Sequence, residues 1–522
     1  MACHALRKYS GLILLLTALV LVRVIALDAD TLPSLDWTSG IWTDEGFYTY
    51  HARNAILFGR GDLDEFHNQL LSPILDWVQR GVFAAFGVSL ISARAISVVC
   101  SLFALGFFFD ALRRTLGSRI ALTGLIFLGG DVVFVLYNRL ALLETPSVLV
   151  LCAALWALTL KRPAGWLLAG ALAASAVAFK TTFLIFLPVP LLVWGGRRER
   201  LYYAAGILSG FGLYLALWGI PHGVEVWRMN NYYRVHQSQP RSVGEAFACA
   251  GRALFAPRRA LLAFLETRTP VLTTLALLGL FCVRWKRRHG DMERVLWLWA
   301  VLGLVSLCFT RYAPTRYFLL IYPPFAGLAA ITLWRLIPLG HWIRRDHRQR
   351  ARWIVPLFLV AYHTCGLALP VIAWAAALLL RRPRPRVFAQ ATLALFLTIS
   401  LGQWGYWYAT RGYRTRDVAR EIAGVVRPGE VLVGDWGPNL CLNNSVRAAP
   451  VFPTFANGHS PMQTLRPDYI LVAQTPYPVA YWKREAPNVV RPENIVRRVP
   501  FHDYLLVLYR VPKEARKEPT PP

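Results

Sequence analysis

Residues 1–410 alternate long apolar runs with short clusters of arginine and lysine. A membrane-spanning helix needs about 17 to 25 predominantly apolar residues, and runs such as 11–27, 201–219 and 387–405 come close to that length. The run 353–380 has basic clusters at both ends, so we interpret it as two short helices joined by a turn. The pattern predicts a polytopic membrane protein with about 13 spans.

The basic clusters fall in alternate connections between these runs, for example at 284–288 and 344–352. Positively charged short loops stay on the cytoplasmic side of a membrane. This places the N-terminus in the cytoplasm and the long polar loops 28–91 and 220–269 outside. We therefore predict a multi-pass protein of a bacterial inner (plasma) membrane, with an extracytoplasmic C-terminal domain.

The pattern changes after residue 410. Three apolar segments bounded by glycine, proline and asparagine are typical of strands: 431–435, 469–473 and 504–509. The predicted fold is therefore mostly α, with a membrane domain at 1–410, a small extracytoplasmic α/β domain at 411–511, and a charged, proline-rich tail at 512–522 that we expect to be disordered.

Composition supports the membrane assignment. Hydrophobic residues make up 56% of the chain and charged residues only 16%, whereas a soluble protein has about 25% charged residues. The net charge is +28, but much of the excess lies in short loops, where it indicates topology rather than nucleic-acid binding. The 8 cysteines form no CxxC pair and no metal-ligand spacing.

The first external loop contains two adjacent carboxylates, Asp44 and Glu45, followed by an aromatic, helix-compatible run. A carboxylate at a membrane face can act as a general base or hold a metal ion. Asp is also a favoured N-cap residue, so Asp44 can equally cap the following helix. The pair alone leaves both interpretations open.

Further charged and polar residues from distant segments are predicted on the same outer face: Glu65, His67, Arg139, Glu144, Lys180, His222, Arg311 and Arg316. A transporter typically holds such groups near the middle of the membrane, whereas an enzyme acting on a lipid-borne substrate needs them at the edge. A single cation at a helix end is more often an anchor in the headgroup layer. The convergence of acids and bases favours an enzyme.

The stretch 44–54 resembles the opening motif of the family 39 glycosyltransferases, which include protein O-mannosyltransferases and bacterial aminoarabinose transferases. Segments 71–75, 86–89 and 138–144 are similar to later family motifs in order and spacing, as are Lys180 and the Arg316-Tyr317 pair. The resemblance covers most of residues 1–336.

The resemblance implies a GT-C fold with its active site on the non-cytoplasmic side. It also implies an inverting glycosyltransferase that moves a sugar from a polyprenyl-phosphate donor to a hydroxyl of a lipid, glycan or protein. The alternative is a polytopic transporter or flippase of lipid-linked sugars.

By the same resemblance Asp44 is the general base, and Glu45 is a second catalytic residue that orients Asp44 or the acceptor. The candidate ligands of the donor phosphate are Arg139, Lys180, His222, Arg316 and Tyr317. Aminoarabinose transferases have a Glu-Lys pair, and its Glu helps bind a metal. Residues 66–73 lack this pair. A divalent metal therefore stays open, with Glu65, His67 and His222 as candidate ligands, and no other cofactor is expected.

Overall fold

The structure is a computed structural model. It describes residues 2–342 and 385–514, apart from residues 60, 62–67, 233, 236–238, 256–263, 266–267, 284–290 and 454–456. The predicted helix pair at 353–380, most of the predicted tail, and the candidate metal ligands Glu65 and His67 lie outside the described residues.

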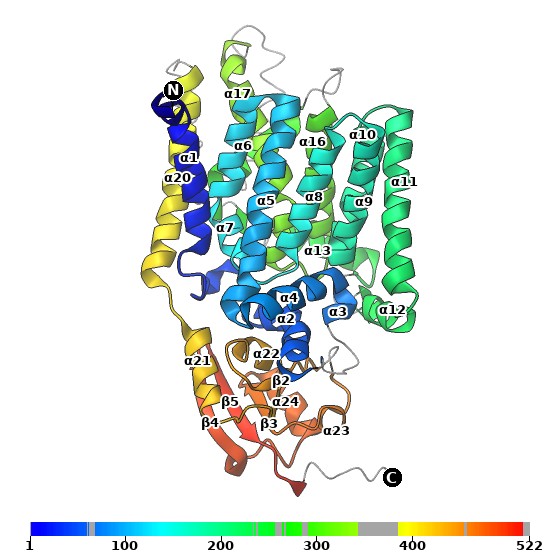
Figure 1. Cartoon of the computed structure of the whole chain (residues 1–522), viewed down its shortest axis with the longest axis vertical. Helices are drawn as coiled ribbons and strands as arrows, with labels where there is room; N and C mark the ends of the chain where they lie inside the picture. Colours follow the sequence, from blue (N-terminus) through cyan, green and yellow to red (C-terminus); the bar gives the residue numbers. More distant parts are fainter. Residues whose placement is uncertain are drawn as a thin grey trace.

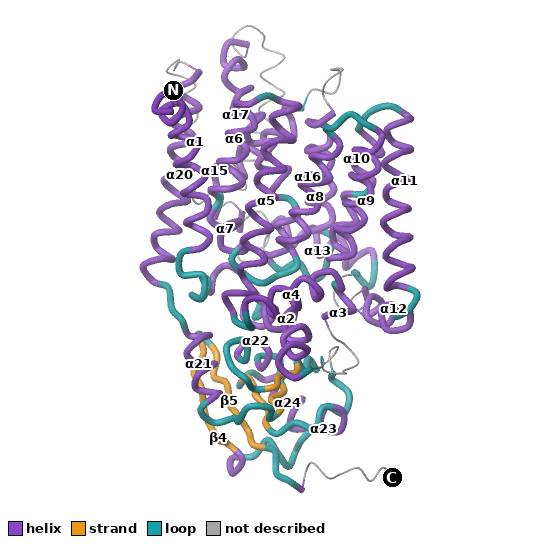
Figure 2. The backbone as a smooth tube through the Cα atoms, viewed as in Figure 1, coloured by secondary structure: helices purple, strands orange, loops and turns teal. Residues whose placement is uncertain are grey.

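Long helices run side by side and form most of the molecule (Figures 1 and 2). Their bounds are α1 Ala2–Val24, α5 Leu90–Leu116, α6 Ser118–Gly130, α8 Glu144–Leu158, α9 Pro163–Phe179, α11 Arg197–Tyr214, α15 Pro270–Cys282, α16 Asp291–Cys308, α17 Tyr322–Trp342 and α20 Pro385–Thr410. Shorter elements connect them: α7 Val132–Asn138, α10 Pro188–Val193, α13 Val243–Phe255, the 3₁₀ helices η1 Pro33–Leu35, η2 Thr181–Phe186 and η5 Thr315–Leu320, and the π-helical η3 Leu215–Gly219.

The predicted count of about 13 spans is not confirmed. Within the described residues, two helices, Leu90–Leu116 and Arg197–Gly219, are long and apolar enough to cross a membrane, and α6 with α7 forms a third candidate bent by 62°. Other apolar helices, such as α8 and α9, are shorter than 18 residues. Bends and short 3₁₀ segments divide the apolar runs, which hydropathy alone does not reveal.

A layer of shorter helices lies between the bundle and a small sheet (Figure 1). It contains α2 Gly40–Phe58, α3 Asn68–Leu71, α4 Pro73–Phe86 and α12 Gly223–Tyr232. Helix α4 is amphipathic: it buries Leu75 and Phe83, whereas Trp77 and Phe86 are exposed. This is the pattern expected of a helix lying in a membrane interface.

The C-terminal part is a five-stranded sheet of order β2-β1-β3-β5-β4. Its strands are β1 Val431–Val433, β2 Arg447–Ala449, β3 Tyr469–Ala473, β4 Ile495–Phe501 and β5 Tyr504–Arg510, and its helices are α21 Arg414–Ala423, α22 Gly437–Leu440, α23 Pro461–Thr464, α24 Pro476–Glu485 and the 3₁₀ helix η6 Pro492–Asn494. Strand β1 is parallel to β2 and β3, and β5 is antiparallel to β3 and β4. The mostly helical fold with a small C-terminal sheet confirms the prediction at this level.

One apolar core extends from the bundle into the sheet. Buried residues of the helices, such as Phe134 and Trp299, belong to the same cluster as Trp436 and Leu471 of the sheet region. The other face of the sheet packs around Tyr481 and Trp482 of α24. Phe47 and Tyr50 of α2 belong to the core that the bundle and the sheet share, which fixes the position of the helical layer between the bundle and the sheet.

Candidate active site

Asp44 lies inside helix α2 rather than at its start. The helix begins at Gly40 after the N-cap residue Ser39 and ends at Gly59, whose φ of +76° suits glycine. The alternative that Asp44 caps the helix is therefore wrong. Its carboxylate is free to take part in contacts across the helix layer.

Asp44 pairs with Arg316, which lies in the first turn of η5. Asp44 Oδ2 is 2.7 Å from Arg316 Nη2, and the side chains are 13% and 5% exposed. Arg316 also lies 3.5 Å from Asp36 Oδ2 and 3.6 Å from Glu144 Oε1. Burial raises the pKa of Asp44 above its ordinary value, Arg316 opposes this shift, and the negative charge of Glu144 reinforces it.

A second ion pair adjoins the first. Lys180, the C-cap residue of α9, pairs with Glu144 Oε1, and its Nζ lies 4.1 Å from the centre of the Tyr317 ring. Helix α8 begins at Glu144, so an acid lies at one helix N-terminus and a cation at a neighbouring C-terminus, as helix dipoles favour. Asp44, Glu144, Lys180, Arg316 and Tyr317 form one group, which we call the charged cluster.

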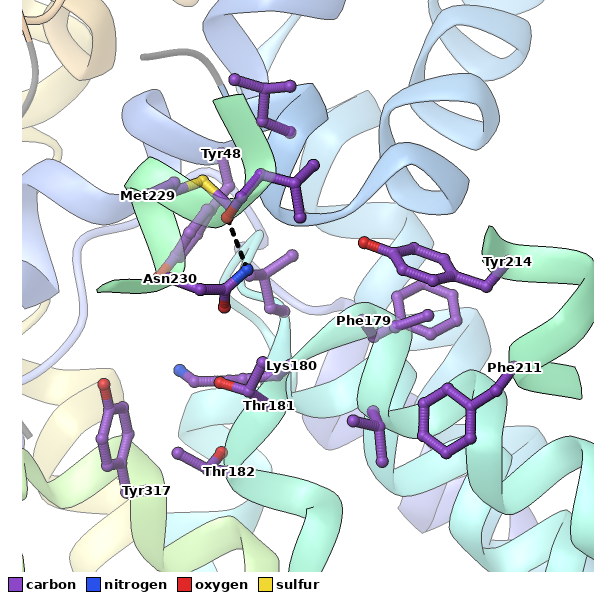
Figure 3. A pocket seen from close by; sticks show the side chains of 15 residues that line it. Tyr48, Phe179, Lys180, Thr181, Thr182, Phe211, Tyr214, Met229, Asn230 and Tyr317 are labelled. Atoms are coloured by element: carbon purple, nitrogen blue, oxygen red, sulfur yellow. Dashed lines mark hydrogen bonds between the residues drawn. The ribbon is translucent and has the colours of Figure 1, made fainter. Parts of the chain in front are cut away.

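The charged cluster borders a cavity of about 350 Å³. Lys180 and Tyr317 lie on one side of it and Phe211 and Tyr214 on another (Figure 3). Tyr48, one helical turn after Asp44 on α2, also lines the cavity. A cavity in which a cation lies beside phenolic and apolar side chains suits an amphiphile with an anionic headgroup.

Comparisons with known proteins show what this chain is similar to. Residues 71–221 match the family model described as dolichyl-phosphate-mannose-protein mannosyltransferase. No curated protein matches the chain. Among solved structures, ArnT from Cupriavidus metallidurans bound to undecaprenyl phosphate is 17% identical with a TM-score of 0.56, covering 96% of this chain and 98% of that one. The oligosaccharyltransferase AglB from Archaeoglobus fulgidus, in complex with an inhibitory peptide and a dolichol-phosphate, is 13% identical with a TM-score of 0.51, covering 92% and 71%.

The chain therefore shares the GT-C fold of ArnT and AglB, and part of its helical region is similar to the mannosyltransferase model. Both findings agree with the resemblance found in the sequence. They favour a glycosyltransferase over the transporter alternative.

Glu45, next to Asp44, belongs to a different network of contacts. Arg94 of α5 donates from Nε to Glu45 Oε1 at 2.8 Å and from Nη2 to Oε2 at 2.6 Å, and the Ala141 backbone N–H donates to Oε1 at 2.8 Å. Both side chains of the pair are 2% exposed. Adjacent helix residues point about 100° apart, which separates the two carboxylates. Because both Glu45 oxygens are bound, this carboxylate serves as an anchor rather than as a base.

Two predicted phosphate ligands lie apart from the charged cluster. Arg139 donates to the carbonyls of Val22 and Arg23 in the last turn of α1 and of Ala26 just after it, and its guanidinium lies over the Trp407 ring at 4.5 Å. This contact satisfies carbonyls that a helix end leaves without partners.

His222 is the other residue, and it packs on the Trp218 ring at 4.2 Å, at the turn before α12. In the described part of the chain, no group of three or more His, Cys, Asp or Glu side chains is arranged to hold a metal. Glu65 and His67 are not described, so metal binding by this protein stays a prediction.

Glu144 is the member of the charged cluster to which sequence reasoning gave no role. Its side chain is buried, and its Oε2 atom has no hydrogen-bond partner among the described residues. Its position in the 138–144 segment that resembles the family was the available signal. The role of its carboxylate depends on Lys180, which lies 36 positions away in the chain.

Proposed function

We propose that this enzyme transfers a sugar from a polyprenyl-phosphate donor to a hydroxyl of a lipid, glycan or protein, with inversion at the anomeric carbon. The observation that carries the proposal is the pairing of Asp44 with Arg316 next to Lys180, which lines a cavity with many apolar side chains. That arrangement provides a base, cations for a phosphate and an apolar space for a lipid.

The cations of the cluster would bind the donor phosphate. Cleavage of the bond between sugar and phosphate adds negative charge to the phosphate oxygens, and preorganised cations in a buried site stabilise that charge. Lys180 lines the cavity directly, and Arg316 lies behind it on Tyr317. Undecaprenyl phosphate in the ArnT structure and dolichol-phosphate in the AglB structure support a donor of this class.

Asp44 would accept the proton of the acceptor hydroxyl. The acceptor oxygen then attacks the anomeric carbon from the side opposite the phosphate, the bond from that carbon to the phosphate oxygen breaks, and the phosphate leaves with the bonding pair. A single attack of this kind inverts configuration and needs one carboxylate base, unlike the paired carboxylates of glycosidases. Burial raises the pKa of Asp44, which makes its ionised form a stronger base.

Glu144 would modulate the cation that faces the donor. Its carboxylate pairs with Lys180 and lies 3.6 Å from Arg316 Nε. In the free enzyme the Glu144 carboxylate neutralises the positive charge of Lys180. We infer that the donor phosphate, when it binds, takes over part of this neutralisation. The cluster would thereby keep its cations oriented before the donor binds.

The proposed orientation places the N-terminus in the cytoplasm and the sheet outside a bacterial inner membrane. Helix α11 begins at the basic segment 197–200, at the end of the bundle away from α2 and the sheet (Figure 1). Positively charged loops favour the cytoplasm, so this separation supports an extracytoplasmic site. The proposed domains are 1–410 and 411–511, and α20 ends at Thr410.

The test is sugar transfer by the purified full-length chain from synthetic polyprenyl phosphates that bear mannose or aminoarabinose, with lipid, glycan and peptide acceptors offered in parallel. We expect Asp44→Asn to lose at least about 100-fold in kcat and still bind undecaprenyl phosphate. Asp417→Asn changes a carboxylate that is half exposed on α21 and should retain full activity. A folded Asp44→Asn protein that transfers sugar at the normal rate would exclude Asp44 as the base.

A further inference from the structure

The C-terminal sheet region packs along the side of α2 that is opposite Asp44. We propose that this contact positions the catalytic helix, and that Gly46 and Arg53 are the positioning residues that transmit it. The inference rests on the proposed role of Asp44 as the base. It gives the sheet region a function in sugar transfer itself.

Helix α2 has two functional faces, because residues about 100° apart return to the same side every three or four positions. Asp44 and Tyr48 share the face toward the charged cluster and the cavity. Trp42, Gly46 and Arg53 share the other face. There the Trp42 ring stacks on His502 of the β4–β5 turn, with centroids 4.1 Å apart.

Gly46 is the point of closest approach. A Cβ at this position would lie 2.0 Å from the backbone nitrogen of Asn439 and 2.4 Å from the carbonyl carbon of Pro438, both in α22. Ordinary van der Waals contact begins at 3.4 Å. Because the opposing atoms are backbone, no side-chain rotation relieves the clash, and α2 and α22 must move apart.

Arg53 fixes the other end of the same face. Its side chain is fully buried, and Nη2 donates to the carbonyls of Asn444 and Val446, each at 2.7 Å. The neighbouring Asn54 donates from Nδ2 to the carbonyl of Ala448 in edge strand β2 at 2.8 Å. The helix therefore holds the sheet edge by hydrogen bonds at one end and by close backbone packing near Asp44.

The sheet side of the contact is itself rigid. Helix α22 follows β1 through Gly434, whose φ is +139° and whose Cβ would lie 2.3 Å from the Leu471 carbonyl oxygen. Asp30, in the segment after α1, accepts a hydrogen bond from the Arg414 backbone N–H at 2.7 Å at the start of α21. Because β1 and Gly434 hold the start of α22, and α21 is bonded to the segment after α1, we expect a displacement at Gly46 to be absorbed largely by α2.

The experiment compares Gly46→Ala with Gly81→Ala in the full-length enzyme. Both glycines lie inside helices, but a Cβ at Gly81 meets nothing within 4 Å, so it controls for the effect of alanine on a helix. A displacement of about 1 Å can cost about 100-fold in rate. We expect Gly46→Ala to lower kcat about 10- to 100-fold, with the KM for the better of the two synthetic donors changed less than about 3-fold.

Two further readouts separate positioning from a general structural effect. Because Arg316 lowers the pKa of Asp44, moving α2 away from Arg316 should shift the acid limb of the rate profile to higher pH. If Gly46 acts through Asp44, adding Gly46→Ala to Asp44→Asn should cause no further loss of the residual rate.

Arg53→Lys keeps the charge but replaces the guanidinium, which bonds two carbonyls through Nη2 and Asn54 Oδ1 through Nη1, with a single nitrogen. It carries the test if Gly46→Ala fails to fold. For Arg53→Lys we expect a smaller fall in kcat than for Gly46→Ala. We also expect the acid limb of its rate profile to shift to higher pH. Equal kcat and equal pH profiles for Gly46→Ala and Gly81→Ala overturn the inference, as does a further loss in the double variant. An active Asp44→Asn enzyme overturns the proposed function instead, so the two failures are distinguishable.

Discussion

The adjacent carboxylates Asp44 and Glu45 offer a matched pair of substitutions with opposite expected effects. Asp44→Asn and Glu45→Gln each replace one carboxylate with an amide of nearly the same shape. In the structure Asp44 contacts the charged cluster, whereas Glu45 is enclosed by Arg94 and the Ala141 N–H. We expect the first substitution to remove activity and the second to remove stability.

The magnitude for Glu45→Gln follows from its three hydrogen bonds. Removing one partner of a buried ion pair costs about 3–5 kcal/mol, because the remaining charge stays buried without compensation. The glutamine oxygen can still accept one hydrogen bond from Arg94 or from the Ala141 N–H, so we expect the lower end, about 3 kcal/mol. That corresponds to roughly a 100-fold fall in the ratio of folded to unfolded protein.

The magnitude for Asp44→Asn differs because burial already disfavours its charge. Burial raises the pKa of Asp44, so loss of the ionised carboxylate relieves a desolvation cost while it removes the pairing with Arg316. Arg316 keeps Asp36 and Glu144 as partners. We expect a stability change within about 1 kcal/mol and a fall in kcat of about 10²- to 10⁴-fold.

The assay pairs denaturant unfolding in detergent, followed by tryptophan fluorescence, with transfer kinetics on the same preparations. Arg94→Lys is the conservative check on the anchor, because lysine keeps the charge but loses the paired hydrogen bonds. It should be less destabilising than Glu45→Gln. If Glu45→Gln unfolds at the same denaturant concentration as the unmodified enzyme, the assignment of Glu45 as an anchor is refuted.

Three further predictions follow from the same contacts. Arg316→Gln should move the acid limb of the kcat/KM profile to higher pH, because Arg316 lowers the pKa of Asp44 against the effect of burial. A profile of kcat/KM measured from about pH 4 to pH 8 checks the direction of this shift. An acid limb at the same pH in both proteins contradicts the prediction. Lys180→Met should weaken binding of undecaprenyl phosphate about 10- to 100-fold, the size of one charge-assisted contact, whereas Arg139→Met should leave the affinity unchanged. A titration followed by tryptophan fluorescence quenching measures both affinities. Equal losses in the two variants would argue against separate roles for Lys180 and Arg139. Burial raises the pKa of Asp435 from an ordinary 3.8 to about 7, so the folded chain keeps a proton that the unfolded chain releases, and stability falls as pH rises through that window. Asp435→Asn should therefore raise the unfolding temperature near pH 8 and give no advantage near pH 4, which thermal unfolding across that range measures.

Much of the fold could be predicted from the sequence because hydrophobic periodicity reports burial directly. The apolar runs gave a helical membrane protein, and the strands predicted at 431–435, 469–473 and 504–509 correspond to β1, β3 and β5. Strands β2 and β4 were missed. Strand β2 has only three residues, and β4 is an edge strand whose exposed positions carry Arg497 and Arg498, so neither shows a regular apolar pattern.

The site was predictable only as far as residue type and predicted topology allowed. The sequence pointed to Asp44, Lys180 and Arg316, and the structure places them in one charged cluster. It also pointed to Arg139, which instead bonds the carbonyls at the end of α1. An arginine at a helix end has the same sequence pattern whether it faces a ligand or a neighbouring backbone, and only the packing of α1 distinguishes the two.

Three consecutive residues explain why the stretch around Asp44 organises the molecule. Asp44 contacts Arg316 of η5, Glu45 contacts Arg94 of α5, and Gly46 packs on the backbone of α22. A helix rotates by about 100° per residue, so Asp44, Glu45 and Gly46 point in three different directions. Each therefore contacts a different element: η5, α5 or α22. If the sequence were shifted by one position along the helix, the aspartate would occupy the site at which Arg94 and the Ala141 N–H bind Glu45. The glutamate side chain would then face the backbone of α22. The Asp-Glu-Gly order is therefore a geometric requirement of α2, in which the base is held on one side by an ion pair and on the other by close backbone packing.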